Sequence, residues 1–227
     1  MTIEPIAILH SPLEGKFGVP RQSGLAASLE CEVELLPPYR REEALRGLEG
    51  FDYIWLIWEF SLNGKGEETD EKAGVQLTVR PPRLGGNTRV GVFASRSPFR
   101  PNRLGLSSVK IAGIDGARGV IRILGADLAD GTPIYDIKPY VPYSDAHPDA
   151  RGGFTDSAEW KSLKVEFAPG VAEAAGRLGI GALTEILSQD PRPQYQDDPT
   201  REYGLSYAGR NVHFKVAGDL LTVIAVD

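Results

Sequence analysis

Short segments rich in β-branched and aromatic residues, separated by prolines and glycines, fill the first two-thirds of the chain. Several alternate between apolar and polar positions, as at Val109 and Ile111 and again at Ile121 and Ile123, which is the period of a half-buried strand. Asp52–Ser61 is apolar on both faces, so we expect a central strand there. The pattern predicts one helix at Arg41–Leu48 and strands at Ile3–His10, Glu30–Leu36, Asp52–Ser61, Val75–Val79, Arg89–Phe93, Ser107–Ile114, Gly119–Leu124, Pro133–Ile137 and Ser162–Phe167.

The pattern changes near residue 168. Apolar residues recur at roughly helical spacing over Ala168–Gln189, although three glycines weaken the middle of that helix. Asn211–Val216 and Leu220–Val226 then read as a β-hairpin. We therefore expect two domains, at 1–167 and 168–227. The second has about 60 residues, a size that is marginal alone, so it should pack on the first domain or on a partner subunit.

Many short strands with turns between them favour a mainly β fold, a barrel or a sandwich, followed by a smaller α+β domain. A doubly wound nucleotide-binding sheet is not expected. Its glycine-rich loop must follow a strand, and the one candidate, Gly176–Gly181, follows none of the predicted strands.

Composition is that of a soluble globular protein, with 41% hydrophobic and 25% charged residues. No apolar run is long enough to cross a bilayer, and the first residues lack the pattern of a signal peptide. Cys31 is the only cysteine, so no intrachain disulfide can form, and we expect a reducing, cytoplasmic location. The three histidines show no metal-ligand spacing, so no metal site is expected.

Charge is distributed unevenly along the chain. The net charge is −6, yet no Asp or Glu occurs from Lys72 to Ile114, a stretch that carries eight of the 25 basic residues. A positive patch on an acidic body suits a site for an anion or a nucleic-acid backbone. The same arginines could instead pair with acidic residues from elsewhere in the fold, and charge alone does not separate the two readings.

Two segments carry candidate chemistry. The loop between Val92 and Ser107 holds three arginines and is stiffened by two prolines, so its guanidinium groups are held in place for a carboxylate or phosphate ligand. Further on, Asp136, Lys138 and Tyr140 lie two apart, so an extended backbone would place them on one face. Such a trio could position a polar substrate and move a proton, or it could be a surface ion pair beside a packed tyrosine.

In these segments and others the chain resembles the bacterial tRNA N6-threonylcarbamoyladenosine methyltransferases, the TrmO family, also called YaeB or TsaA-like. The resemblance covers nearly the whole chain in order, and the joint occurrence of its motifs is very specific. The motifs are Phe17–Gln22, Val79–Asn87, Gly91–Leu106, Asp130–Tyr143 and Asp190–Pro193.

The resemblance implies a small β-barrel that binds S-adenosylmethionine (SAM), a C-terminal domain that helps to hold the anticodon loop of tRNA, and a homodimer. The cofactor contacts that it implies are Pro20, Arg21, Gln22, Ser61, Leu62, Arg96, Leu106, Leu128, Ala129, Asp130 and Gly131. For substrate and tRNA we expect contacts from Arg80, Arg83, Arg100, Asn102, Arg103, Arg192 and Tyr195.

The expected reaction is methylation of N6 of threonylcarbamoyladenosine at position 37 of tRNA. That nitrogen lies between an adenine ring and a carbamoyl carbonyl, so it is a poor nucleophile until its proton leaves. Asp136 or Tyr140 is the candidate proton acceptor, with Lys138 beside them. Two alternatives stay open: a non-catalytic module that binds SAM or a nucleotide, and a methyltransferase of the same fold that acts on a small molecule.

Overall fold

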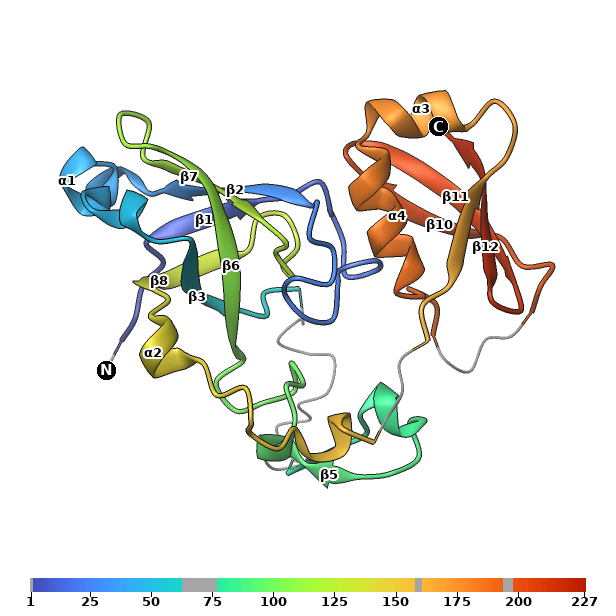
Figure 1. Cartoon of the computed structure of the whole chain (residues 1–227), viewed down its shortest axis with the longest axis horizontal. Coiled ribbons are helices and arrows are strands. Elements are labelled where there is room, and N and C mark those ends of the chain that lie inside the picture. The colour runs from blue at the N-terminus through green and yellow to red at the C-terminus, as the bar shows by residue number, and fades with distance from the viewer. Residues whose placement is uncertain (1, 63–76, 158–160, 194–197) are drawn as a thin grey trace.

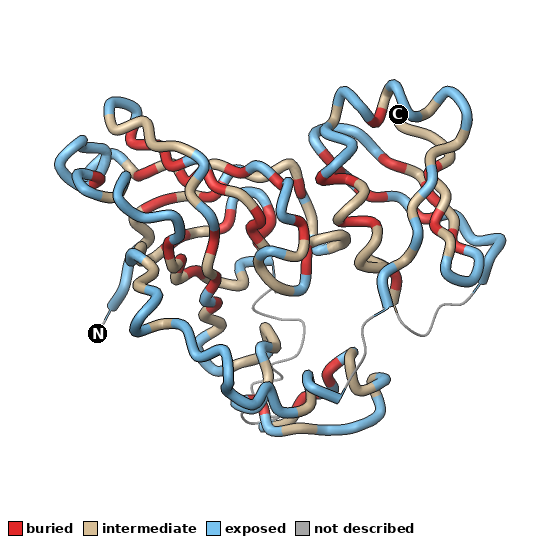
Figure 2. The backbone as a smooth tube through the Cα atoms, viewed as in Figure 1, coloured by how far each residue is buried: buried red, intermediate tan, exposed pale blue. Residues whose placement is uncertain are grey.

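The computed structural model describes residues 2–62, 77–157, 161–193 and 198–227. It contains a closed β-barrel and a second, four-stranded sheet covered by helices (Figure 1). Figure 2 shows that many of the buried residues of both parts lie on the strands and on α4 (Ile180–Ser188), and that others lie in the loops between them.

Six antiparallel strands form the barrel, in the order β1-β2-β7-β6-β3-β8, with β8 pairing back onto β1. Closure leaves no unpaired edge strand, which is how a small β fold avoids edge-to-edge association. The predicted mainly β fold is confirmed. The strands are β1 (Ala7–His10), β2 (Glu30–Leu35), β3 (Tyr53–Glu59), β6 (Leu104–Asp115), β7 (Val120–Leu124) and β8 (Pro133–Pro139).

Strand β3 fits the expectation of a central strand, since it pairs with β6 on one side and β8 on the other. Its inward side chains alternate along the strand and are buried, with Ile54, Leu56 and Trp58 at 5% exposure or less. On its outer face Trp55 is covered by the Tyr140 ring, whose centroid lies 5.6 Å away. The outer apolar residues of β3 are thus partly covered without a second sheet.

The second sheet has the strand order β10-β11-β12-β9. The predicted hairpin is confirmed as β11 (Arg210–Ala217) and β12 (Leu220–Val226). Strand β10 (Tyr203–Tyr207) was not predicted. Strand β9 (Lys164–Phe167) pairs in parallel with β12, so it belongs to this sheet although it precedes residue 168.

The helix predicted over Ala168–Gln189 is wrong in its extent, because the structure has two helices, α3 (Ala172–Arg177) and α4 (Ile180–Ser188). Gly179 separates them with φ 87°, a left-handed conformation that ends a helix and that glycine adopts without strain.

The remaining elements are short. The helix predicted at Arg41–Leu48 is restricted to α1 (Glu42–Leu45), because Gly47 turns with φ 88°. The strand predicted at Arg89–Phe93 is only two residues long, and the one at Val75–Val79 lies partly outside the described residues. The other elements are α2 (Pro142–Asp145), strands β4 (Thr78–Val79) and β5 (Val90–Gly91), and 3-10 helices at Pro37–Tyr39, Leu48–Gly50, Pro82–Leu84, Val92–Ala94 and Gly153–Thr155.

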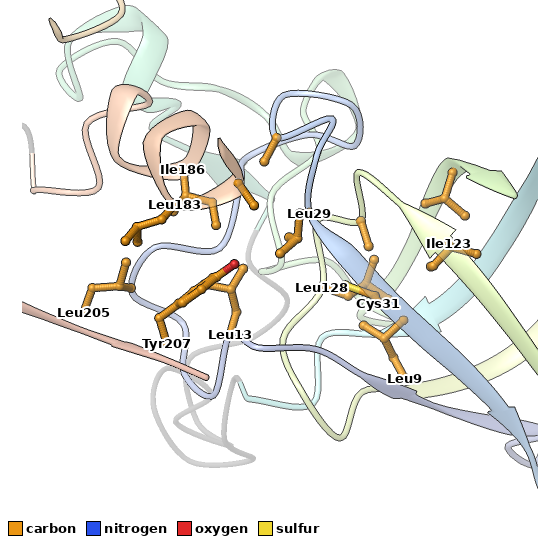
Figure 3. Close-up of a cluster of buried hydrophobic side chains, with 14 of the residues drawn as sticks. Leu9, Leu13, Leu29, Cys31, Ile123, Leu128, Leu183, Ile186, Leu205 and Tyr207 are labelled. Carbon is orange, nitrogen blue, oxygen red and sulfur yellow. The ribbon is translucent and has the colours of Figure 1, made fainter. Parts of the chain in front are cut away.

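One apolar core runs through both parts of the molecule. Figure 3 shows Leu13 and Leu29 of the first part beside Leu183 of α4 and Tyr207 of β10. Backbone bridging between Leu13 and Tyr207 adds to this contact. The expectation that the small C-terminal domain packs on the first is therefore confirmed. None of the described helices has the length and apolar character needed to cross a membrane.

Gly105 on β6 gives a direct test of the barrel packing. A Cβ at this position would fall on the indole ring of Trp58, which is buried and cannot move away. We expect Gly105→Ala to lower the free energy of unfolding by about 1–3 kcal/mol, the usual cost of overpacking a core. Urea denaturation measures this, with Gly91→Ala as control because its added methyl group meets open space. Equal unfolding midpoints for Gly105→Ala and wild type would contradict the packing described.

Candidate functional site

The arginine-rich loop, residues 92–103, leads from a 3-10 helix into β6. Its own hydrogen bonds help to hold it in shape, since Arg100 Nη1 donates to the carbonyl oxygen of Ser95 at 3.1 Å. Arg96 and Asn102 are exposed on it, while Arg100 is half-buried. Arg100 thus contributes to the shape of the loop.

Arg103 is held at the rim of the barrel. Its Nη2 lies 2.8 Å from Oε1 of Glu59, the last residue of β3. The other oxygen of Glu59 accepts a hydrogen bond from the Tyr135 hydroxyl at 2.6 Å, which raises the pKa of that phenol. A contact between Arg103 and a substrate carboxylate would compete with this ion pair.

A row of hydrogen-bonded side chains, buried at Trp58 and Ser107 and partly buried at Asp127, occupies the barrel mouth, which we define as the end where β3 finishes and β6 begins. The indole N–H of Trp58 donates to the Ser107 hydroxyl oxygen at 2.9 Å. The Ser107 hydroxyl donates to Asp127 Oδ1 at 2.5 Å. Burial raises the pKa of Asp127, and this effect is opposed by its hydrogen bond from Ser107 and by the nearby charge of Arg96.

Two of the predicted cofactor residues meet beside this row. Arg96 donates through Nη1 to the side-chain oxygen of Gln22. The backbone of the next residue, Ser23, lies close enough to the Asp127 carboxylate to lower its pKa. Segments more than 70 positions apart in the sequence are therefore joined at the mouth.

The predicted cofactor segment Leu128–Gly131 follows Asp127 directly. Leu128 and Ala129 are buried, so a ligand could reach these two residues only through their backbone. Asp130 and Gly131 are exposed, and Gly131 has φ 72° in the turn before β8. The Asp130 carboxylate accepts the backbone N–H of Ser11 at 2.9 Å.

The outer face of the barrel brings Leu106 and Asp136 into one row. Leu106 pairs with Ile57 on β3, and Ile57 pairs with Asp136 on β8. Neighbouring strands lie about 4.8 Å apart, so Leu106 and Asp136 are separated by roughly 10 Å. Leu106 is 56% exposed and offers an apolar surface.

The other two proposed catalytic residues lie further along β8 and its end. Lys138 pairs loosely with Asp136, with 3.7 Å between Nζ and Oδ2. Tyr140 packs against Trp55 and Tyr53, at the opposite end of β3 from the mouth. At about 3.3 Å per residue it lies roughly 13 Å beyond Asp136. The structure does not bring Tyr140 to Arg96 and Gln22 at the mouth.

A cleft of about 420 Å³ lies between the N-terminal loop at residues 16–21 and the end of α4 with the loop that follows it. Partial desolvation lowers the pKa of Arg21, opposed by the charge of Asp190 and reinforced by that of Arg83. A positive charge therefore lies at this junction, close to an acidic one. The cleft is lined by Lys16, Phe17, Gly18, Val19, Arg21, Ile186, Gln189, Asp190 and Pro191.

Arg192 directly follows Asp190 and Pro191, which line this cleft. It is 9% exposed, and it donates through Nε and Nη2 to the two oxygens of Asp190 at 2.8 and 2.9 Å. This fork geometry fixes the loop after α4. A contact between Arg192 and tRNA stays a prediction that requires this pair to open. Tyr195 lies outside the described residues.

The remaining predicted residues lie at the edges of the site. Ser61 and Leu62 are exposed directly after β3, and Pro20 is buried at the start of the loop that carries Gln22. Arg80 is exposed and Arg83 half-buried in the proline-rich turn after β4.

The sequence analysis missed three residues of the mouth: Trp58, Ser107 and Asp127. Trp58 and Ser107 were assigned only to strands. Asp127 lies three residues before the Asp130–Tyr143 motif, and its side chain was not considered. The signal that could have found it is an acidic residue placed between a buried strand and a Gly-Thr-Pro turn. No set of three or more His, Cys, Asp or Glu residues within the described ranges could hold a metal ion.

Comparison with known proteins gives matches over the whole chain. The family model described as the tRNA-methyltransferase O N-terminal domain matches residues 8–146, and the one described as the TrmO C-terminal domain matches residues 161–227. The tRNA (adenine(37)-N6)-methyltransferase of Escherichia coli K12 is 39% identical, over 99% of this chain and 97% of its own length.

Other matches agree with these. A Pseudomonas aeruginosa protein named as a putative S-adenosylmethionine-dependent methyltransferase, RcsF, is also 39% identical, over 99% of this chain and 97% of its own. A solved structure titled as TrmO from P. aeruginosa superimposes with a TM-score of 0.79 at 33% identity, covering 100% of this chain and 98% of that one.

Proposed function

The chain belongs to the tRNA-methyltransferase O family, and we propose that it transfers a methyl group from SAM to N6 of the adenosine at position 37 of a tRNA. The observation that carries this function is the similarity to a tRNA (adenine(37)-N6)-methyltransferase over 99% of the chain. The chain is thus an S-adenosylmethionine-dependent tRNA methyltransferase. The name of the Escherichia coli relative, a tRNA (adenine(37)-N6)-methyltransferase, supports neither a non-catalytic binding module nor a small-molecule methyltransferase.

The residues at the barrel mouth fit a ligand such as SAM. SAM has a carboxylate and an ammonium group at one end and an apolar, aromatic adenosine at the other. Arg96 and Gln22 offer a guanidinium and an amide beside each other, while Leu106 and Leu62 offer exposed apolar surface. When bound, SAM supplies a methyl group on a sulfonium, so the protein's task is alignment and exclusion of water.

We propose threonylcarbamoyladenosine as the nucleoside that is methylated. Its N6 must lose a proton, and Asp136 is the better placed of the two candidate acceptors because it shares a row with Leu106. Lys138 would lie beside this carboxylate and help to orient it. The threonyl carboxylate would pair with Arg100 or Arg103. If it pairs with Arg103, the ion pair between Arg103 and Glu59 would be replaced by one between Arg103 and the substrate.

The anticodon loop would lie along the basic loops and reach the interdomain cleft. The exposed positions of Arg80 and Asn102 support phosphate contacts there, and the charge of Arg21 and Arg83 extends the same surface. The C-terminal domain would add Arg192 and Tyr195.

We further propose that the protein acts as a homodimer in the cytoplasm. Large apolar side chains are exposed around the basic loop, with Phe93 at 76%, Leu77 at 66% and Leu106 at 56%. A second copy covering them would also shield the methyl donor from water. Sedimentation of the wild type and of Phe93→Asp tests this, and a wild-type monomer at micromolar concentration would contradict it.

Methylation of purified tRNA tests the proposed function. The protein is incubated with labelled SAM and two matched tRNAs, one carrying threonylcarbamoyladenosine at position 37 and one with plain adenosine. We expect label only in the first, at N6 of that nucleoside, as found by nuclease digestion and mass spectrometry. Equal labelling of both would contradict the threonylcarbamoyl requirement, and labelling of neither would contradict the function.

A further inference from the structure

Asp127 connects three segments of the barrel mouth. From β6, the Ser107 hydroxyl donates to its Oδ1 at 2.5 Å. From the N-terminal loop, the backbone of Ser23 lies close enough to the same carboxylate to lower its pKa. From the arginine-rich loop, the charge of Arg96 lowers the pKa of Asp127, and the Arg96 side chain donates a hydrogen bond to Gln22.

The anchor of this arrangement is rigid. Trp58 is 5% exposed and its indole N–H fixes the Ser107 hydroxyl at 2.9 Å, so that the hydroxyl proton is directed to Asp127. The indole is in turn held against Gly105, where no side chain could fit. The carboxylate is therefore placed by two paired strands of the barrel, β3 and β6.

An ionised carboxylate is costly in this place. Burial is the largest influence on Asp127 and raises its pKa, so the fold pays a penalty for its charge at neutral pH. A neutral side chain could accept the Ser107 hydroxyl without that penalty. The negative charge of Asp127 is useful only if it attracts another group. The charged group whose effect on Asp127 is favourable is Arg96.

We propose that Asp127 is a positioning residue for the methyl-donor site, holding the 20–23 loop and the Arg96 guanidinium in the arrangement that binds SAM. The identity of the ligand rests on the proposed function, but the positioning of the two loops does not. Asp127 is absent from the contacts that the resemblance implied, because it acts through Gln22, Ser23 and Arg96.

Three variants test this role. Asp127→Asn keeps the shape and removes the charge. Ser107→Ala keeps the charge of Asp127 and removes the hydroxyl group that is bonded to its carboxylate. If Asp127→Asn does not fold, the proposal is tested by Ser107→Ala alone. Glu185→Gln is the matched control, because Glu185 also holds a serine through its backbone N–H and hydroxyl, at 2.7 and 2.8 Å, away from the mouth.

Two readouts are compared for each variant. The first is hydrogen exchange of the ligand-free protein in peptides covering 20–24 and 92–100. We expect faster exchange in both peptides for Asp127→Asn and Ser107→Ala, and wild-type exchange for Glu185→Gln. The second is the dissociation constant for SAM by calorimetry. It should rise roughly 10- to 100-fold in Asp127→Asn, the range for loss of a charge-assisted hydrogen bond.

A purely structural role would give a different result. Loss of a structural contact alone would lower the melting temperature. In Asp127→Asn this loss is offset because the cost of burying a charge is also removed, so we expect a melting temperature within about 4 °C of wild type. At saturating SAM its kcat should fall less than about threefold, because the loss lies in ligand binding.

Wild-type exchange at 20–24 and 92–100 in both Asp127→Asn and Ser107→Ala would overturn the proposal, whatever the protein methylates. A wild-type dissociation constant for SAM in both variants would overturn it equally. Failure of the wild type to methylate tRNA would instead count against the proposed function alone, since the exchange experiment needs no ligand.

Discussion

Replacing Arg96 with alanine is expected to lower kcat/KM for tRNA methylation about 100-fold, with the fold intact. Arg96 is exposed on a loop that other contacts hold, so its removal costs little stability. Its guanidinium joins Gln22 and faces Asp127, at the centre of the proposed donor site. Loss of a charged hydrogen-bonding group that contacts a ligand costs about 1.5–3 kcal/mol, or roughly 10- to 150-fold. Initial rates at varied SAM concentration measure the effect.

Two variants serve as controls for Arg96→Ala. Arg118→Ala removes an exposed arginine from the turn between β6 and β7, at the other end of β6 from the mouth, and should have wild-type activity. Arg96→Lys keeps the charge but not the planar fork, so it should recover only part of the activity. Wild-type rates for Arg96→Ala would mean that the loop has no part in the reaction.

The strands were predictable because a barrel interior imposes a strict alternation. In β3 and β6 the inward positions are apolar or small, and the period of two is visible without any knowledge of the partner strand. Partner choice is not visible in the same way. Strand β9 has an ordinary alternating pattern, and only the structure shows that it pairs with β12, 53 or more residues later.

Strand β10 shows how local signals can mislead. Tyr203, Leu205 and Tyr207 alternate as a strand requires and are all buried. Gly204 lowers the apparent strand propensity of this segment. The pairing of β10 with β11 overrides this local signal, and a single sequence does not reveal that pairing.

Residues of the candidate site could be predicted where their role follows from the type of side chain. They could not be predicted where their role depends on burial in the folded protein. Arg96 and Gln22 were expected from the resemblance, and the structure joins them. Asp127 was missed because its proposed role depends on desolvation and on Ser107, which lies 20 residues earlier on β6. For Arg192 the residue type suggested an exposed phosphate contact, whereas it is buried against Asp190.

The shared core makes deletion of the C-terminal domain a drastic change. Residues Leu13 and Leu29 are fully buried, and they lie beside α4 and β10 in Figure 3. Each fully buried leucine contributes about 1.5–3 kcal/mol by its burial. Because the net stability of a domain is only about 5–15 kcal/mol, uncovering these residues removes a large part of it. Deletion also removes β12, the pairing partner of β9.

We therefore expect the chain truncated after residue 167 to lose cooperative folding and to bind neither SAM nor tRNA. Calorimetric melting and calorimetric titration with SAM measure this. If uncovered apolar surface is the cause, then Leu13→Gln with Leu29→Gln in the truncated chain should recover solubility. A truncated chain that melts cooperatively and binds SAM as the full chain does would show that the barrel is independent. In the expected case, the RNA role of the C-terminal domain is tested by substitution, with Arg201→Ala on its exposed surface as the first variant.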